Sequence, residues 1–359
     1  MPSLREMSDF LKQEAFRAGF DLAGVAGIQD SPELQYFANW IASGYGGEMK
    51  YLESCDDSGQ LKRASLPRAA PWVRSVVVCA INYNTAEPYS TEVSSPKNGW
   101  ISRYAWSRED YHEAVLRRLQ IVENKLLEST QEPVQTRCYV DTGPLVERVY
   151  AKYAGVGWMG KNTCILNQKL GSWLFLGVIL TSLELPPDVP APDRCGTCTR
   201  CIEACPTDAF VAPYKLDSKK CISYLTIEKR GTIAEELRQG MGQQVFGCDI
   251  CQDVCPWNRK APITKADEFH PRPELVNPAL EWLARMNAEE FAGTFRSSPI
   301  KRAKLSGLRR NAAIAMGNSK DRGFIPILRQ LAKDANETIS EAAGWALREL
   351  QKDLPANRT

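Results

Sequence analysis

Residues 195–206 read C-G-T-C-T-R-C-I-E-A-C-P, and residues 248–256 read C-D-I-C-Q-D-V-C-P. In both segments cysteines recur at short intervals, and the last cysteine precedes a proline. The first segment matches the bacterial run in which three thiolates bind one cubane iron–sulfur cluster and the fourth binds a second cluster. The second segment lacks one cysteine at its start, and Cys221 is the obvious fourth member. The pattern therefore predicts two 4Fe-4S clusters.

The cysteines of these segments, with Cys221, equal in number the eight thiolates that two cubanes require. Crosswise sharing assigns Cys195, Cys198, Cys201 and Cys255 to the first cluster. It assigns Cys205, Cys221, Cys248 and Cys251 to the second cluster. Zinc and disulfides are the alternatives. Zinc sites usually combine two separated pairs of ligands, and disulfides belong to oxidising compartments, so the pattern favours iron–sulfur clusters.

The composition is that of an ordinary soluble protein, with 43% hydrophobic and 25% charged residues among 359. This length suits two or three domains. The net charge is only +2, but residues 296–359 contain 13 Lys and Arg against 6 Asp and Glu. Positive charge is therefore concentrated at the carboxyl end of the chain.

The first ten residues, M-P-S-L-R-E-M-S-D-F, lack the apolar centre of a signal peptide, and no later apolar run approaches membrane-spanning length. We therefore expect a cytoplasmic protein without membrane contact, and a monomer as the default. The presence of only His112 and His270 excludes a multi-histidine metal site. The remaining cysteines are scattered and are expected to be reduced core residues: Cys55, Cys79, Cys138 and Cys164.

Predicted helices and strands alternate before the cysteine segments. Ser3 is expected to cap a helix that ends at Gly19, and the β-branched, apolar residues 75–82 predict a buried strand. Further predicted elements are a helix over 111–127, a strand over 134–140, a helix from Pro144 to Ala154 with the proline in its first turn, and a strand over 172–181. The alternation favours an α/β layer around one sheet.

The proline-rich run L-P-P-D-V-P-A-P-D (185–193) is expected to link this layer to the cysteine segments. After the last cysteine, helices are predicted over 308–318, 324–334 and 339–350, and their alternation resembles a short HEAT-type repeat. One and a half such units must pack on the preceding domain to be stable. We therefore expect an α/β catalytic domain (1–185), a ferredoxin-like two-cluster domain (186–265) and a helical HEAT-like domain (266–359).

The glycine-rich run G-V-G-W-M-G-K-N (155–162) departs from a nucleotide-binding phosphate loop. Asn162 replaces the required Ser or Thr, and the run follows a predicted helix instead of a strand. Nucleoside triphosphate binding is therefore not expected. The turn can still present Lys161, Asn162 and Thr163 to a polar group of a cofactor.

Three other features have both a structural and a functional interpretation. Asp141 follows a predicted strand, where a carboxylate usually caps the next helix, yet loops at strand ends also carry catalytic groups. The aromatic run W-I-S-R-Y-A-W-S-R-E-D-Y-H (100–112) is either a surface loop or a wall that stacks on a planar ligand. A basic patch is either a solvated helical face or a phosphate-binding surface: Arg296, Lys301, Arg302, Lys304, Arg309 and Arg310.

Several motifs together resemble those of epoxyqueuosine reductases. They are D-T-G-P (141–144), G-W-M-G-K-N-T (157–163), the first cysteine run, C-I-S-Y-L-T-I-E (221–228) and G-C-D-I-C-Q-D-V-C-P-W-N (247–258). Many ferredoxin-like proteins share the cysteine run, whereas the last two motifs are far more specific. The family's loop reads R-Y-A-x-G-R-D-Y-H. Here residues 103–112 read R-Y-A-W-S-R-E-D-Y-H, which is one residue longer and lacks the glycine.

The resemblance implies a cobalamin-dependent oxidoreductase that reduces epoxyqueuosine to queuosine at the wobble position of tRNA anticodons. Electrons would come from an external low-potential donor through two 4Fe-4S clusters. The resemblance also implies that residues 1–185 form an α/β cobalamin-binding core related to that of the corrinoid reductive dehalogenases. The alternatives are a dehalogenase-like enzyme that acts on a small molecule, a pure electron carrier, and a structural zinc protein that binds RNA.

Site residues follow from the same resemblance. Asp141 is expected to be the general acid that protonates the departing epoxide oxygen. The expected lining of the cobalamin pocket comprises Asp141 with Arg63, Tyr104, Trp158, Lys161, Asn162, Thr163, Ser223 and Asp249. The expected tRNA contacts are Lys229 and Arg230, together with Arg302, Lys304, Arg309 and Arg310 of the basic patch.

Overall fold

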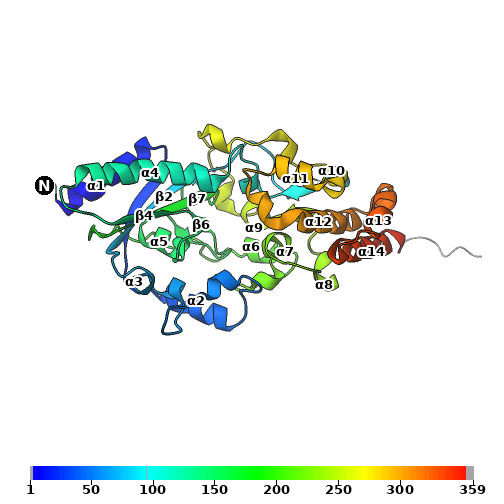
Figure 1. Ribbon diagram of the computed structural model, residues 1–359, viewed down its shortest axis with the longest axis horizontal. Helices are drawn as coiled ribbons and strands as arrows, with labels where there is room; N and C mark the ends of the chain where they lie inside the picture. The colour runs from blue at the N-terminus through cyan, green and yellow to red at the C-terminus, as the bar shows by residue number, and fades with distance from the viewer. Residues whose placement is uncertain (1–2, 94, 353–359) are drawn as a thin grey trace, which may run out of the picture.

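The computed structural model describes residues 3–93 and 95–352. The molecule is elongated, with a β-sheet and its covering helices at one end and a group of helices at the other (Figure 1). The cysteine segments lie between these ends, where the short helices α6 (Arg200–Glu203) and α9 (Ile250–Asp253) each carry cysteines. The order of parts along the chain is thus also their order along the molecule.

The main sheet has four strands in the order β1 (Leu22–Gly27), β2 (Ser75–Asn82), β7 (Leu174–Thr181) and β4 (Thr136–Tyr139). The predictions of β2, β7 and β4 are confirmed, and each strand end lies within two residues of its predicted position. Every pairing in this sheet is antiparallel, so the alternation of helices and strands did not produce a parallel sheet. β1 was not predicted, because L-A-G-V-A-G has small side chains and little β-branching.

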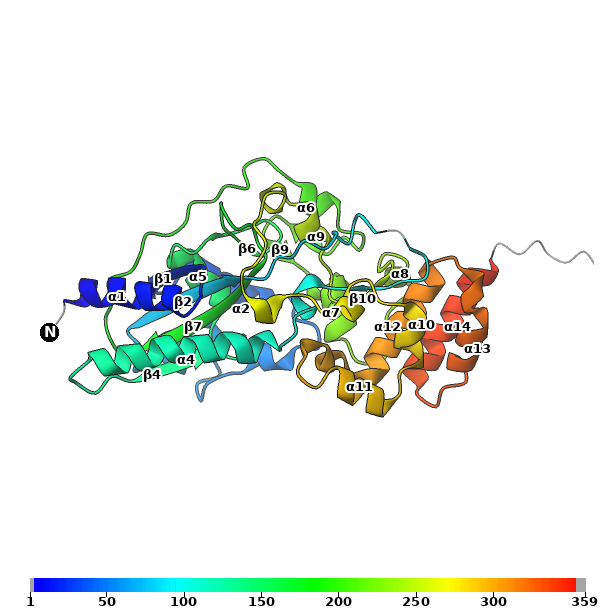
Figure 2. The ribbon, with the colours of Figure 1, turned by 90° about the horizontal axis from the view of Figure 1, so that it is seen from above.

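Helices cover both faces of the sheet (Figure 2). On one face α1 (Leu4–Arg17) and α4 (Tyr111–Ser129) pack against Val77, Cys79 and Ile179. On the other face α3 (Leu66–Ala69) and α5 (Glu147–Tyr153) pack against Val76 and Val78. Alternate residues of β2 therefore enter two different cores, which explains why this strand is apolar along its whole length.

Local signals place the helix ends correctly in one case and wrongly in another. Ser3 caps α1 through a reciprocal pair of hydrogen bonds with Glu6, as predicted, and Gly19 follows the helix with φ +89°. The predicted start of α5 at Pro144 is wrong. The helix begins at Glu147, because the D-T-G-P segment forms an irregular loop around Asp141.

The aromatic run is joined to the carboxyl-terminal half at its start and to the main sheet at its end, where Tyr111 stacks on Phe175 of β7. β3 (Trp100–Ile101) pairs in parallel with β10 (Gln244–Phe246), and both lie in one hydrophobic core with the helical end of the molecule. The linker is also fixed in place: Asp188 accepts hydrogen bonds from Val25 N at 2.8 Å and from Lys12 Nζ at 2.6 Å.

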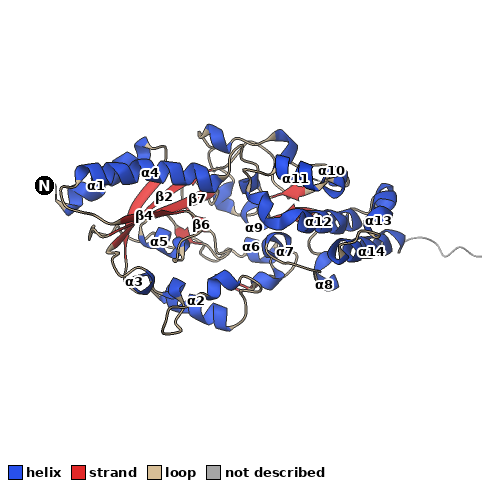
Figure 3. Cartoon of the chain, viewed as in Figure 1, coloured by secondary structure: helices blue, strands red, loops and turns tan. Residues whose placement is uncertain are grey.

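Helices make up the carboxyl-terminal end (Figure 3). They are α10 (Leu280–Arg285), α11 (Ala288–Thr294), α12 (Lys304–Asn318), α13 (Ile325–Leu331) and α14 (Glu337–Gln351). The three helices predicted after residue 307 are thereby confirmed, whereas their description as a HEAT-type repeat stays a prediction. Buried Asn311 of α12 donates to Thr226 O at 2.9 Å and to Val245 O at 2.8 Å, and so holds this end on the cysteine segment.

The remaining elements are short. They are α2 (Pro32–Ala42), the hairpin of β5 (Trp158–Met159) and β6 (Ile165–Leu166), the hairpin of β8 (Phe210–Ala212) and β9 (Lys215–Leu216), α7 (Ile222–Ile227) and α8 (Glu235–Arg238). Among the described residues, no helix is both long enough and apolar enough to cross a membrane.

Candidate functional site

The structure gathers the cysteines of the two segments into two groups. Burial and the nearby Cys195 and Cys198 raise the pKa of Cys201 to about 11. Burial, with Cys201 and Cys195 close by, likewise raises the pKa of Cys255 to about 11. In the other group, burial and the nearby Cys221 and Cys205 raise the pKa of Cys248. Each cysteine thus has the neighbours that crosswise sharing requires.

The surroundings of both groups suit thiolates bound to iron. Backbone N–H groups hydrogen-bond to cysteine sulfurs, for example Ala209 N to Cys205 Sγ at 3.4 Å, and such donors stabilise ligands and tune a cluster. Within residues 3–93 and 95–352, no three metal-ligating side chains converge on a single-ion site. The ligands of a cubane stand farther apart, because each thiolate binds a different iron atom.

The first cysteine group lies beside two tryptophans. The rings of Trp158 and Trp257 are 5.1 Å apart and pack with Cys195 and Cys255. The buried indole N–H of Trp158 has no acceptor within the described protein, which suits a sulfur of a cluster bound there. Lys161 Nζ donates to Gly196 O at 2.7 Å and Cys198 O at 3.0 Å. Two residues expected around cobalamin, Trp158 and Lys161, therefore contact the first cysteine group.

The second cysteine group adjoins Asp141 through a row of aromatic rings. Cys248 packs in the same core as Tyr104, whose ring centroid lies 5.9 Å from that of Tyr111. The Tyr111 hydroxyl donates a hydrogen bond to Asp141 Oδ2. The pKa of Tyr111 is raised well above its ordinary value by burial and by the charge of Asp141, so this hydroxyl keeps its proton.

Asp141 is exposed and held in an uncommon backbone conformation. Its φ of +60° is rare for a residue other than glycine, and such conformations cluster at functional sites. Its backbone N–H donates to Glu147 Oε1 at 2.8 Å, and His112 Nε2 lies 3.7 Å from its carboxylate. The loop therefore directs a carboxyl group outward beside two further groups that can exchange protons.

Glu147 supports Asp141 from inside the protein. Burial and the neighbouring charge of Asp141 raise the pKa of Glu147 well above its ordinary value. On the other side, His112 Nδ1 lies 2.7 Å from Asp110 Oδ1, and Lys301 Nζ lies 3.3 Å from Asp110 Oδ2. Burial opposes ionisation of Asp110, but the hydrogen bonds and charge of His112, together with Lys301, outweigh it and lower the pKa of Asp110. The site thus contains a protonated carboxyl and an ionised one.

The other expected pocket residues lie around Asp141 and the second cysteine group. Arg63 Nη1 donates to Leu145 O at 3.0 Å, beside the Asp141 loop. Buried Asn162 donates to Cys251 O at 3.3 Å, while Thr163 adopts φ +65° next to it. The hydroxyls of Tyr104 and Ser223 form no hydrogen bond with the part of the chain that the structure describes. These groups leave donors available to a bound polar molecule.

Asp249 was expected to line the pocket, but it lies behind it. It is 1% exposed and accepts hydrogen bonds from Trp100 Nε1 at 3.0 Å, from Ser102 Oγ and from Arg103 N at 2.7 Å. Both carboxylate oxygens are therefore occupied. Asp249 fixes the start of the aromatic run that carries Tyr104, and it does not present a free carboxylate to a ligand.

Most of the cations expected to bind tRNA are engaged within the protein. Arg302 forms an ion pair with Glu228 at 2.5 Å and covers the ring of Tyr51 at 5.2 Å. Lys229 is paired with Glu48, whose other oxygen accepts from Arg230 N at 2.9 Å. Arg302 still lies near Asp141, because the charges of both residues act on Tyr51 and on Tyr104.

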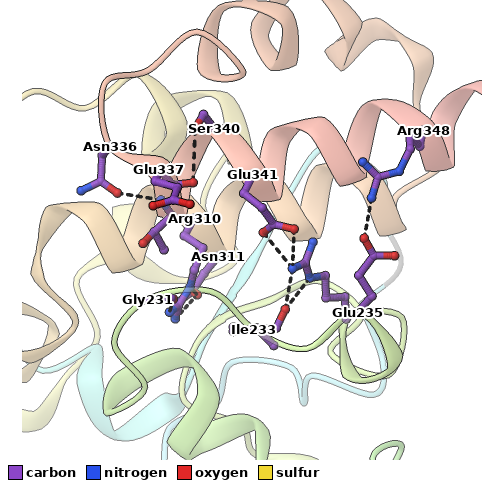
Figure 4. Close-up of polar contacts among 12 residues, drawn as sticks. Gly231, Ile233, Glu235, Arg310, Asn311, Asn336, Glu337, Ser340, Glu341 and Arg348 are labelled. Carbon is purple, nitrogen blue, oxygen red and sulfur yellow. Dashed lines mark hydrogen bonds and ion pairs between the residues drawn. The ribbon is translucent and has the colours of Figure 1, made fainter.

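The basic helix α12 requires a correction. Arg310 lies beside Gly231 (Figure 4) and donates to Gly231 O and Leu225 O, each at 2.7 Å. It is 1% exposed, so it is not part of an exposed basic face. Arg309 pairs with Asp334 at 2.9 Å. Lys304 is exposed and forms no ion pair among the described residues. Of these three cations on α12, only Lys304 is free to meet a phosphate.

Sequence reasoning missed Glu147 and the acid–base roles open to Tyr111 and His112. The D-Y-H segment was interpreted only as part of a stacking wall. Glu147 gave a helical signal like any other glutamate, because only the fold shows that it is buried beneath Asp141.

Comparisons with known proteins agree on one family. Residues 63–142 match the family model described as epoxyqueuosine reductase QueG, DUF1730, and residues 194–258 match the model of a 4Fe-4S double cluster binding domain. The epoxyqueuosine reductase of Pseudomonas aeruginosa is 37% identical over 353 residues, covering 97% of this chain and 95% of that protein. That of Synechocystis is 42% identical over 293 residues, covering 81% and 98%.

Solved structures give the same result. An epoxyqueuosine reductase with an epoxyqueuosine-modified tRNA stem loop superposes with a TM-score of 0.86 at 30% identity, covering 97% of this chain and 91% of that chain. The Bacillus subtilis enzyme, with its catalytic aspartate loop swung out of the active site, gives a TM-score of 0.85 at 29% identity over the same shares. With near-complete coverage and an identity well above 30% to the curated relatives, this chain belongs to the epoxyqueuosine reductase family.

Proposed function

We propose that this chain reduces epoxyqueuosine to queuosine at the wobble position of tRNA anticodons, with Asp141 as general acid. The main support is the position of Asp141, which is exposed and has a left-handed backbone conformation. Tyr111 and Tyr104 connect it to the core that contains Cys248 of the second cysteine group. Removal of the epoxide oxygen as water consumes two electrons and two protons. The arrangement supplies electrons from the cysteine side and protons from the carboxyl side of one site.

The residues around Asp141 fit cobalamin. A corrin ring has a flat apolar face and a rim of amides, and the protein offers the ring of Tyr104 with unpaired hydroxyls on Tyr104 and Ser223. Arg63, Asn162 and Thr163 would hold its periphery. Bound there, cobalamin supplies a reducible cobalt centre that combines single electrons into a two-electron reduction.

The chain's own residues manage the protons. Asp141 would deliver a proton to the departing oxygen, while Tyr111 and the backbone contact to Glu147 orient its carboxyl group. Glu147 retains a proton in its buried position and lies in contact with Asp141, so it can restore the proton that Asp141 gives up. His112, held by Asp110, provides a second route.

The substrate would approach over the Asp141 rim. A relative of known structure binds an epoxyqueuosine-modified tRNA stem loop, and here Lys229, Arg230, Arg302 and Lys304 carry positive charge next to the site. Phosphates attract such cations without base specificity. We further propose that one chain acts alone, as a monomer, with the domain limits 1–185, 186–265 and 266–359 and with a HEAT-like final domain.

The test is a single-turnover assay with Asp141→Asn, which keeps the side-chain shape and removes the acid. After anaerobic reconstitution with iron, sulfide and cobalamin, the variant should form queuosine in epoxyqueuosine-containing tRNA about 100-fold more slowly than the unmodified protein, or slower still. Iron content, cobalamin spectrum and tRNA affinity should be unchanged. Equal single-turnover rates would show that another group protonates the oxygen.

A further inference from the structure

The first cysteine group lies near the protein surface. Cys195, Cys198 and Cys201 are half-buried on a loop whose intervening residues, Gly196, Thr197 and Thr199, are exposed. The second group instead contacts the core that contains Tyr104 and leads to Asp141. Electrons from outside therefore have their shortest access at the first group.

Three chain segments meet around this group. The ring of Trp257 packs with Cys195 and Trp158, which joins residues 256–261 to the loop 191–200. The turn at residues 167–171 lies against the same segment, since Ser172 N donates to Asn258 Oδ1 at 2.7 Å and a Cβ added at Gly171 would lie 3.1 Å from Trp257 O. A half-buried tryptophan thus lies where the three segments converge.

The exposed side chains on these segments are basic. We call them the entry surface: Lys169, Arg194, Arg200, Arg259 and Lys260. The same segments contain one carboxylate, Asp193, and it is occupied by Tyr214 Oη at 2.5 Å and by Cys195 N at 2.7 Å. None of the five cations forms an ion pair with any residue that the structure describes.

This lack of partners separates the entry surface from most of the cations that were expected to bind tRNA. Lys229, Arg302 and Arg309 each have a carboxylate partner. Arg310 is buried, where it donates hydrogen bonds to backbone carbonyl groups. The five cations contribute nothing comparable to the fold. Unpaired positive charge around an accessible redox centre attracts a negatively charged partner and accelerates its association.

We propose that the entry surface is the docking site of an acidic, one-electron carrier protein that reduces the first cluster. This inference rests on the proposed function, since it assumes that clusters occupy the cysteine groups. In each encounter the carrier loses one electron and the first cluster gains it, with no bond formed or broken. Two such encounters supply the electrons for one epoxide.

The carrier fits this surface better than RNA does. Electron-transfer partners form small, transient interfaces, and here the five exposed cations lie on the three segments that meet at the half-buried Trp257. The proposed tRNA contacts instead lie on the side of Asp141, where the reacting nucleoside must bind. RNA binding at the entry surface would bring no reactive group to the site.

The test compares charge-reversed proteins in a reduction assay. Reduced flavodoxin, an acidic one-electron donor, serves as the probe, and bleaching of the cluster absorbance is followed by anaerobic stopped flow. R259E/K260E should lower the second-order rate constant at low salt about tenfold and remove most of its salt dependence. R329E/K333E reverses the same number of exposed charges, at Arg329 on α13 and at Lys333 just after it, and should leave the rate constant unchanged.

Two controls make the result decisive. Dithionite should reduce both variants at the unmodified rate, and dithionite-driven queuosine formation should persist in R259E/K260E, which keeps this proposal separate from the proposed function. Equal flavodoxin rates in R259E/K260E and the unmodified protein would overturn the docking site. So would a loss of tRNA affinity in R259E/K260E without any change in the flavodoxin rate.

Discussion

Glu147 shows how a buried carboxyl can serve a neighbouring exposed one. Its raised pKa means that the folded protein keeps this proton at pH values where an ordinary glutamate, with a pKa of 4.5, has lost it. The associated stability is fully present below pH 4.5 and is lost as the pH rises through the raised value, because ionising the buried group costs free energy. The same proton is available to Asp141 during the reaction.

Glu147→Gln should therefore change both stability and activity. Glutamine stays neutral, so the fall in melting temperature toward alkaline pH should become shallower in anaerobic calorimetry. Glutamine cannot pass on a proton, so the single-turnover rate should fall by about 10-fold to 100-fold. Glu132→Gln replaces an exposed glutamate and should alter neither quantity. An unchanged pH dependence in Glu147→Gln would show that Glu147 is ionised in the folded protein.

Arg310 and Lys304 have opposite roles although they lie on the same helix. Arg310 supplies hydrogen bonds to the carbonyl groups of Leu225, Lys229 and Gly231. Arg310→Met leaves these buried acceptors without donors and should lower the free energy of unfolding by about 3 kcal/mol. Lys304→Met should leave stability unchanged and weaken tRNA binding, measured by filter binding at low salt. Equal stability of the two variants would contradict this assignment.

At the scale of elements, the sequence predicted what local patterns can encode. The β-branched run of β2 and the periodic helices α12 and α14 depend on their own side chains, and they form where expected. The parallel pairing of β3 with β10 joins residues far apart in the chain and has no local signal. For the same reason, the sequence indicated Asp141 but not the buried Glu147 beneath it.

Close packing of elements gives a prediction on β1. An added Cβ at Gly24 would lie 2.0 Å from the carbonyl oxygen of Ala154 at the end of α5. Backbone cannot yield cheaply, so Gly24→Ala should cost about 2 kcal/mol of stability in urea unfolding. Gly293 on α11 has no atom within 4 Å of an added Cβ, so Gly293→Ala should stabilise by about 0.5 to 1 kcal/mol. Similar values for both variants would contradict the tight contact between β1 and α5.

For the whole molecule, the predicted crosswise sharing of cysteines would tie distant segments into one electron path. In this assignment the first run, and the second run taken with Cys221, each supply three ligands to one cluster and a fourth to the other, so neither cluster would form from one run alone. The first cluster faces the entry surface, and the second adjoins Tyr104 and the Asp141 loop. Cys205 and Cys255, the fourth ligands in this assignment, each connect one run to the other cluster. They would therefore hold the two clusters close enough for an electron to move from the first to the second.

Exchanging single cysteines distinguishes crosswise from separate sharing. Cys205→Ala changes the first run but should remove the second cluster, so its electron paramagnetic resonance spectrum should match that of Cys248→Ala. Cys255→Ala changes the second run but should match Cys198→Ala. In each variant iron should fall from about eight to about four atoms per chain. If the spectrum of Cys205→Ala instead matched that of Cys198→Ala, each run would hold its own cluster. The proposed route of electrons, from the entry surface through the first and then the second cluster to Asp141, would then be wrong.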